Sequence, residues 1–119
     1  MLENTRIAFV GSGAMGGAMI SGLLSRKRIA PSDIVASDPQ REITEGLHNT
    51  YGVDVSRDNV AACKDADIVV LSVKPQVLPQ VFSGLAGSIP DDALVMSIVA
   101  GANMLCLAEG LEHRSIIRA

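Results

Sequence analysis

The sequence is poor in the residues and patterns that mark several classes of protein. It contains no tryptophan, one tyrosine, two phenylalanines and two cysteines among its 119 residues. No apolar stretch approaches the roughly 20 residues that a membrane-spanning helix needs. The first residues, MLENTR, lack a secretory pattern and lead directly into an expected strand. We therefore expect a cytoplasmic protein with no membrane association.

Positive charge is also in short supply. Ten basic residues against thirteen acidic ones give a formal net charge of −3, which argues against a nucleic-acid partner. The one basic cluster, Arg26-Lys27-Arg28, falls where a helix is expected to end, and there it opposes the negative end of the helix dipole.

Cysteine and histidine are too few and too scattered to predict a metal site. Cys63 and Cys106 lie far apart, each within an expected helix. We expect them to be small buried hydrophobic residues in a reducing compartment rather than a disulfide or metal pair. His48 and His113 stand in polar surroundings without metal-ligand spacing, and we expect both on the surface.

What the sequence does have is a regular alternation of β-rich apolar runs and helical patterns. Hydrophobic residues make up 48% of the chain, enough for the core of one compact domain. Such alternation favours parallel strands joined by right-handed crossovers, which predicts an α/β Rossmann-type doubly wound sheet in strand order 3-2-1-4-5-6. Ligands of these folds bind beyond the carboxyl ends of the strands, here between the first and the fourth. The expected strands are residues 6–10, 33–37, 53–55, 67–73, 94–99 and 115–118, and the expected helices are residues 14–26, 39–51, 59–64, 79–85 and 102–111.

A glycine-rich loop follows the first expected strand and opens the first expected helix. It reads Gly11-Ser12-Gly13-Ala14-Met15-Gly16, a G-x-G-x-x-G pattern that is weak alone and specific in this strand–helix context. Gly11 allows the tight turn, Gly13 lets a pyrophosphate approach the backbone, and Gly16 lets the helix pack on the sheet. Free N–H groups at the helix start would then face the phosphates. The alternative is a glycine-rich turn that binds nothing.

The second expected strand ends at an acid. Asp38 lies roughly 20 positions beyond Gly16, where a ribose-binding carboxylate is expected. Such a carboxylate favours NAD because it repels a 2′-phosphate. Ser37 and Arg41 argue for NADP, since a hydroxyl and a guanidinium can hold that phosphate. Asp38 also precedes Pro39 and could serve only to shape a turn. The preference between NADP and NAD stays open at this point.

The fourth and fifth expected strands end in loops suited to the other half of a dinucleotide. A Lys74-Pro75 step rigidifies the first loop, and Lys74 is either a ribose ligand or simply solvated. Small residues in the stretch from Ser97 to Gly101 leave room for a flat nicotinamide ring.

Together these segments resemble the N-terminal domain of pyrroline-5-carboxylate reductase, the last enzyme of proline biosynthesis. The resemblance rests on RIAFVGSGAMG at residues 6–16, SVKPQ at 72–76 and SIVAG at 97–101. The final IIRA resembles the stretch that leads into the family's Met-Pro-Asn-Thr-Pro signature. The sequence departs from the family at Ala14, where an asparagine is common.

The resemblance implies hydride transfer from NADPH or NADH to the C=N carbon of 1-pyrroline-5-carboxylate, giving L-proline. It implies no catalytic residue within this chain, because a C-terminal helical domain binds the imine and forms the homo-oligomer. Residues 1–119 would be the NAD(P)-binding domain alone, inactive by itself, and residues 115–118 would begin a strand with no closing turn or helix after it. The implied cofactor contacts are Val10, Gly11, Ser12, Gly13, Ala14, Met15 and Gly16 along the phosphates, Ser37, Asp38 and Asn59 around the adenosine ribose, and Ser72, Val73, Lys74, Pro75, Ile98, Val99 and Ala100 beside the nicotinamide.

Two other functions fit parts of the sequence. One is another β-hydroxyacid-type dehydrogenase or NADPH-dependent reductase, although those proteins lack the Val-Lys-Pro-Gln stretch. The other is a non-catalytic nucleotide-sensing Rossmann module, which would have about this length.

Overall fold

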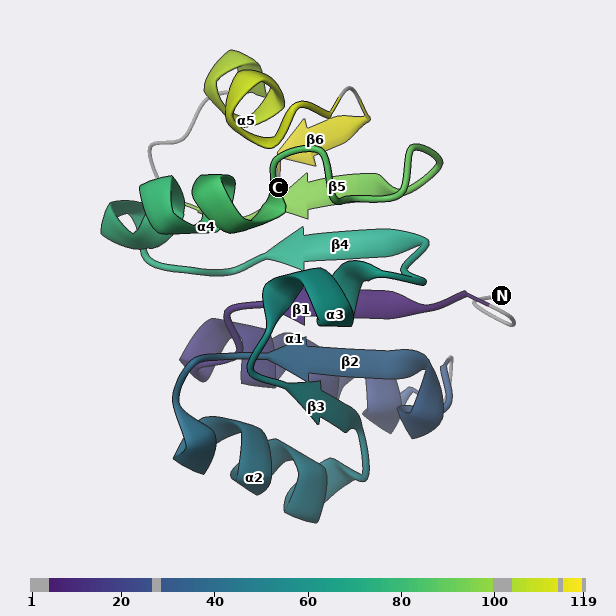
Figure 1. Cartoon of the computed structure of the whole chain (residues 1–119). Coiled ribbons are helices and arrows are strands. Elements are labelled where there is room, and N and C mark those ends of the chain that lie inside the picture. Colours follow the sequence, from purple (N-terminus) through teal and green to yellow (C-terminus); the bar gives the residue numbers. More distant parts are fainter. Residues whose placement is uncertain (1–4, 27–28, 100–103, 114, 119) are drawn as a thin grey trace.

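The computed structural model describes residues 5–26, 29–99, 104–113 and 115–118. Within these residues, six parallel strands form one sheet in the order β3-β2-β1-β4-β5-β6, so the predicted doubly wound fold is confirmed (Figure 1). The strands are β1 (Ile7–Val10), β2 (Ile34–Ser37), β3 (Asp54–Ser56), β4 (Ile68–Leu71), β5 (Leu94–Ser97) and β6 (Ile116–Arg118). The helices are α1 (Ala14–Ser25), α2 (Arg41–Tyr51), α3 (Asn59–Cys63), α4 (Leu78–Leu85) and α5 (Met104–Leu111), with short 3₁₀ turns η1 (Pro31–Asp33) and η2 (Pro75–Val77).

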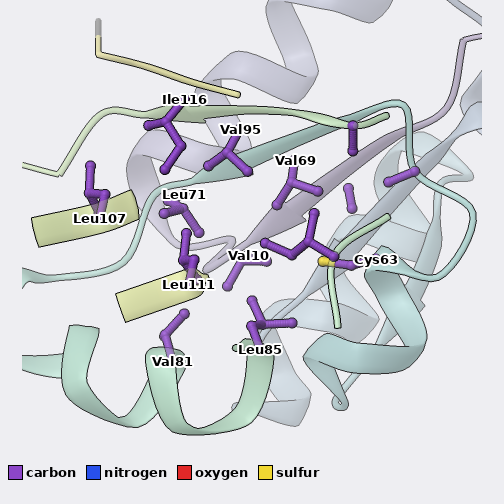
Figure 2. Close-up of a cluster of buried hydrophobic side chains, with 14 of the residues drawn as sticks. Val10, Cys63, Val69, Leu71, Val81, Leu85, Val95, Leu107, Leu111 and Ile116 are labelled. Atoms are coloured by element: carbon purple, nitrogen blue, oxygen red, sulfur yellow. The ribbon is translucent and has the colours of Figure 1, made fainter. Parts of the chain in front are cut away.

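Helices cover the sheet from both faces, and each face has its own apolar core. On one face, α3, α4 and α5 pack against β1, β4, β5 and β6 (Figure 1). Figure 2 shows this cluster, in which Leu85, Leu107 and Leu111 from the helices meet Val10, Val69, Leu71 and Val95 from the strands. On the other face, α1 and α2 pack against β1 and β2 around Phe9, Ile20, Ile34 and Leu47. The central strands are therefore buried on both sides, as their continuous apolar sequences predict.

Asp38 sets the start of helix α2, and Gly52 sets its end. The sequence predicts a start at Pro39, but the helix begins at Arg41, because the Asp38 carboxylate accepts the backbone N–H of Gln40 at 2.9 Å and holds a turn there. It ends as predicted at Gly52, whose φ of 76° is the left-handed conformation that favours glycine.

The predicted burial is confirmed for Cys63, and one histidine prediction is wrong. Cys63 is fully buried, and burial raises the pKa of its thiol to about 12, whereas the side chain of Cys106 lies outside the described residues. His48 is exposed as expected. His113 was expected on the surface but is buried, because its Nε2 donates to the Ala93 carbonyl oxygen at 2.6 Å and thereby ties the end of α5 to the start of β5.

Helix α1 ends at Ser25, with Arg26 as its C-terminal capping residue. The rest of the expected basic cluster, residues 27–28, and the first two residues of the last expected helix, 102–103, lie outside the described residues. No helix in the described ranges is both long and apolar enough to cross a membrane.

Candidate functional site

The sheet register brings three loops to one edge. Val10 at the end of β1 pairs with Ser37 of β2 on one side and with Leu71 of β4 on the other. The residues that follow are therefore neighbours: the Gly11 N–H donates to the Ser37 carbonyl oxygen at 2.9 Å, and the Ser72 N–H donates to that of Val10 at 2.9 Å. All six strands point towards this edge, on the left in Figure 1. It is the edge at which doubly wound folds bind ligands.

Packing within the protein explains two of the three motif glycines. Gly11 has φ +83°, and a Cβ there would lie 2.6 Å from Cγ1 of Val73. A Cβ on Gly16 would lie 2.7 Å from the carbonyl oxygen of Gly11. Both positions are therefore closed to a side chain by the fold itself.

The third motif glycine faces open space. A Cβ on Gly13 would have nothing within 4 Å, so no packing contact requires glycine there. Gly13 is also the N-terminal capping residue of α1, and no side chain caps that helix. The N–H groups of a first helical turn lack partners inside the helix and favour an anion. An uncapped helix start beside an open glycine fits the phosphates of a dinucleotide.

Asp38 braces this loop from the neighbouring strand. Its side chain is only 9% exposed, and its Oδ2 accepts the backbone N–H of Ser12 at 3.1 Å. Its Oδ1 accepts the N–H of Gln40, so Asp38 shapes the turn before α2 at the same time. The Ser12 hydroxyl adds a second link by donating to the Ser37 carbonyl oxygen at 3.1 Å. The sequence predicted the turn, but it gave no sign of the contact with Ser12.

Ser37 and Asn59 form a pair beside Asp38. Ser37 is fully buried, and its hydroxyl donates to Oδ1 of Asn59 at 2.6 Å. Arg41, the first residue of α2, is exposed and forms an ion pair with Glu45 at 2.7 Å. The expected ribose-side residues therefore lie together, with the Ser37 hydroxyl directed inwards.

The loop after β4 contacts the glycine loop directly. The Ser72 hydroxyl donates to the carbonyl oxygen of Gly11, and the Val73 side chain closes over the same residue. Lys74 and Pro75 are exposed and lead into η2. The Lys74 carbonyl oxygen accepts the N–H of Val77 at 2.9 Å, which fixes the course of this loop.

The remaining residues that were expected to contact the cofactor differ in their exposure and surroundings. Ile98 is half-buried and its N–H donates to the Leu71 carbonyl oxygen at 3.0 Å, which places it beside the β4 loop. Val99 is buried in the core of the α4–α5 face, and its N–H donates to the Ser97 hydroxyl oxygen at 3.2 Å. Met15 is 62% exposed on the first turn of α1. Ala100 and the side chain of Ala14 lie outside the described residues.

Comparison with known proteins decides the family. The model of the family described as "NADP oxidoreductase coenzyme F420-dependent" matches residues 6–101, which include all three loops. The chain belongs to this family. It is also 36% identical, over 98% of its length, to the pyrroline-5-carboxylate reductase of Methanosarcina acetivorans. The resemblance to the N-terminal part of pyrroline-5-carboxylate reductases is thereby confirmed.

Solved structures agree on the fold. A pyrroline-5-carboxylate reductase from Coxiella burnetii superposes with a TM-score of 0.90 at 26% identity over 98% of this chain. The pyrroline carboxylate reductase of Plasmodium falciparum, solved with NADP bound, superposes over 98% of this chain with a TM-score of 0.83 at 23% identity. The chain spans less than half of each relative: 44% of the Methanosarcina protein, 43% of the Coxiella chain and 42% of the Plasmodium chain.

Proposed function

We propose that the chain binds a nicotinamide dinucleotide along the loop between β1 and α1. The observation that carries this proposal is the contrast among the motif glycines: the fold closes Gly11 and Gly16 to a side chain, whereas Gly13 faces open space. In a loop that follows a strand and starts a helix, a glycine that packing does not require leaves room for a pyrophosphate to approach the backbone. The uncapped start of α1 supplies N–H groups suited to a pyrophosphate there.

The rest of the dinucleotide would extend to either side of this loop. The adenosine ribose would lie beside Ser37, Asp38 and Asn59, because β2 and the start of α3 meet there. The nicotinamide would lie on the other side, at the ends of β4 and β5. Its expected neighbours are Ser72, Val73, Lys74, Pro75, Ile98, Val99 and Ala100.

We propose further that the chain is the cofactor-binding half of a pyrroline-5-carboxylate reductase. The support is its similarity to enzymes of that name over nearly its whole length, while it spans less than half of theirs. The cofactor would supply a hydride to the C=N carbon of 1-pyrroline-5-carboxylate, and the residues of this chain would orient the cofactor. A second, helical half would hold the imine, exclude water and join two subunits.

A reducing, cytoplasmic compartment belongs to the same proposal. Cys63 is a free thiol within the core, where a disulfide partner could not reach it without opening the fold.

The division of labour can be tested by activity. Hydride transfer needs the two reacting carbons about 3–3.5 Å apart, and positioning of this kind supplies about 7–11 kcal/mol of the barrier. We therefore expect no NADPH or NADH oxidation with 1-pyrroline-5-carboxylate for the 119-residue chain, and turnover for the full product of its gene. Turnover by the chain within tenfold of that product would contradict the proposal.

A further inference from the structure

We propose that this site selects NADH over NADPH and that Asp38 is the residue that determines the selection. The inference rests on the proposed dinucleotide site, and it departs from the NADP in the description of the family. The sequence left three side chains competing for a 2′-phosphate: Asp38 against it, and Ser37 and Arg41 for it. The structure assigns a different partner to each of them.

The Asp38 carboxylate is held in place. One oxygen accepts the Ser12 N–H at 3.1 Å and the other accepts the Gln40 N–H at 2.9 Å. Rotating the carboxylate away from a 2′-phosphate would leave both donors without this acceptor, and unsatisfied N–H groups at a buried loop are costly. The negative charge therefore stays at the ribose end of the site. A carboxylate has about four acceptor positions, so two remain for ribose hydroxyls.

Ser37 cannot serve a phosphate in this arrangement. Its side chain is fully buried, and its hydroxyl hydrogen is committed to Asn59 at 2.6 Å. Reaching an external phosphate would break that bond and expose a residue that pairs with both β1 and β3.

The nearby arginines do not offset Asp38. Arg41 is paired with Glu45 at 2.7 Å. Arg57 follows β3 beside Asp38 and is exposed, and the next residue, Asp58, adds a carboxylate whose Oδ1 accepts the Val60 N–H at 3.1 Å. The formal charges of Asp38, Arg41, Glu45, Arg57 and Asp58 sum to −1. A 2′-phosphate would add about two further negative charges.

Arg41 could leave Glu45, since an exposed pair of this kind contributes little to stability. Its release would free Glu45 as well, so the net charge of the region would not change. The repulsion from Asp38 would persist, because that carboxylate is held by backbone groups and not by an arginine.

The test is calorimetric titration of the chain with NADH and NADPH, and then with ADP-ribose and its 2′-phosphate, which isolate the adenosine end. We expect the Kd for NADH to be about tenfold lower than the Kd for NADPH. ADP-ribose should likewise bind about tenfold more tightly than its 2′-phosphate. Asp38→Asn removes the charge and keeps an oxygen for one N–H donor. It should reduce the NADH preference by about tenfold.

Glu45→Gln is the matched control, because it removes the same charge a short distance away on α2 and frees Arg41. We expect Glu45→Gln to change the ratio of the NADPH and NADH dissociation constants by less than about threefold. Equal shifts in the two variants would refute the role of Asp38. If Asp38→Asn lowers the melting temperature, the comparison is repeated with Asp38→Ser. The preference itself is decided by the parent chain, from its Kd for NADPH divided by its Kd for NADH. NADPH bound as tightly as NADH overturns this inference alone, whereas no binding of either nucleotide overturns the proposed site as well.

Discussion

Gly13→Asp should weaken dinucleotide binding strongly without harming the fold. The space beside Gly13 is open, so the new side chain meets no protein atom near its Cβ. Gly13 is the N-terminal capping residue of α1 and has no side-chain capping bond. Aspartate is among the best residues at that position, and its charge is favourable at the positive end of the helix dipole. We expect the melting temperature of the variant to equal or exceed that of the parent.

The loss of binding can be estimated from charge alone. A pyrophosphate carries about two negative charges, and each would lie about 4 Å from the new carboxylate, where two unit charges interact by about 1 kcal/mol in water. The sum, about 2 kcal/mol, corresponds to about a 30-fold increase in Kd. Gly13 is half-buried, so the effective dielectric constant is below that of water and this figure is a lower limit.

The assay is calorimetric titration with NADH, beside Gly22→Asp as a control. Gly22 is exposed on the same helix, and a Cβ there also meets nothing within 4 Å. It lies nine residues further along α1, about 13 Å away, which is beyond the Debye length at physiological salt. Gly22→Asp should therefore bind like the parent. Unchanged binding by Gly13→Asp, or an equal loss in both variants, would refute the placement of the pyrophosphate.

Three further predictions concern stability. Gly16→Ala should lower the free energy of unfolding by about 1–3 kcal/mol, because its Cβ would lie 2.7 Å from the Gly11 carbonyl oxygen; an unchanged denaturation midpoint would contradict this packing. His113→Ala should cost about 1–3 kcal/mol because it leaves the Ala93 carbonyl oxygen without its buried donor, and His48→Ala, on the surface, should cost less. Burial raises the pKa of the Cys63 thiol from 9.0 to about 12, so above pH 9 the unfolded chain loses a proton that the folded chain keeps. Stability should then fall by about 1.4 kcal/mol per pH unit more steeply in the parent than in Cys63→Ala between pH 9 and pH 12, and parallel curves would refute the buried thiol.

Much of the fold could be predicted from the sequence because each element carries a local signal. The apolar run of β4 indicates a strand buried on both faces, and Gly52 indicates the end of α2. Alternation of strands and helices then leaves few possible topologies. His113 shows where this reasoning fails. A polar neighbourhood in sequence predicts exposure, but tertiary packing brings the Ala93 carbonyl oxygen to its ring.

The candidate site was predictable as a set of loops, and much less so as a set of contacts. The motif glycines and the positions of Asp38 and Ser72 follow from strand ends, and strand ends follow from sequence. The contact between Ser12 and Asp38 depends on the register of β1 against β2, which no local pattern specifies. For the same reason, the sequence could present the turn and ribose functions of Asp38 only as alternatives, and it did not predict that the two carboxylate oxygens hold the turn and the glycine loop together.

These contacts also bear on Ala14, where the resemblance to pyrroline-5-carboxylate reductases leads one to expect an asparagine. Asp38, Ser12 and Ser72 all direct their polar atoms at the backbone of the three loops, so the loops are fixed before any ligand arrives. A loop that is already ordered loses little conformational entropy on binding. At the proposed site, the groups that would face a pyrophosphate are backbone N–H groups at the start of α1, and these do not depend on which side chain follows Gly13. A single side-chain contact could therefore be lost at residue 14 while the backbone cradle remains.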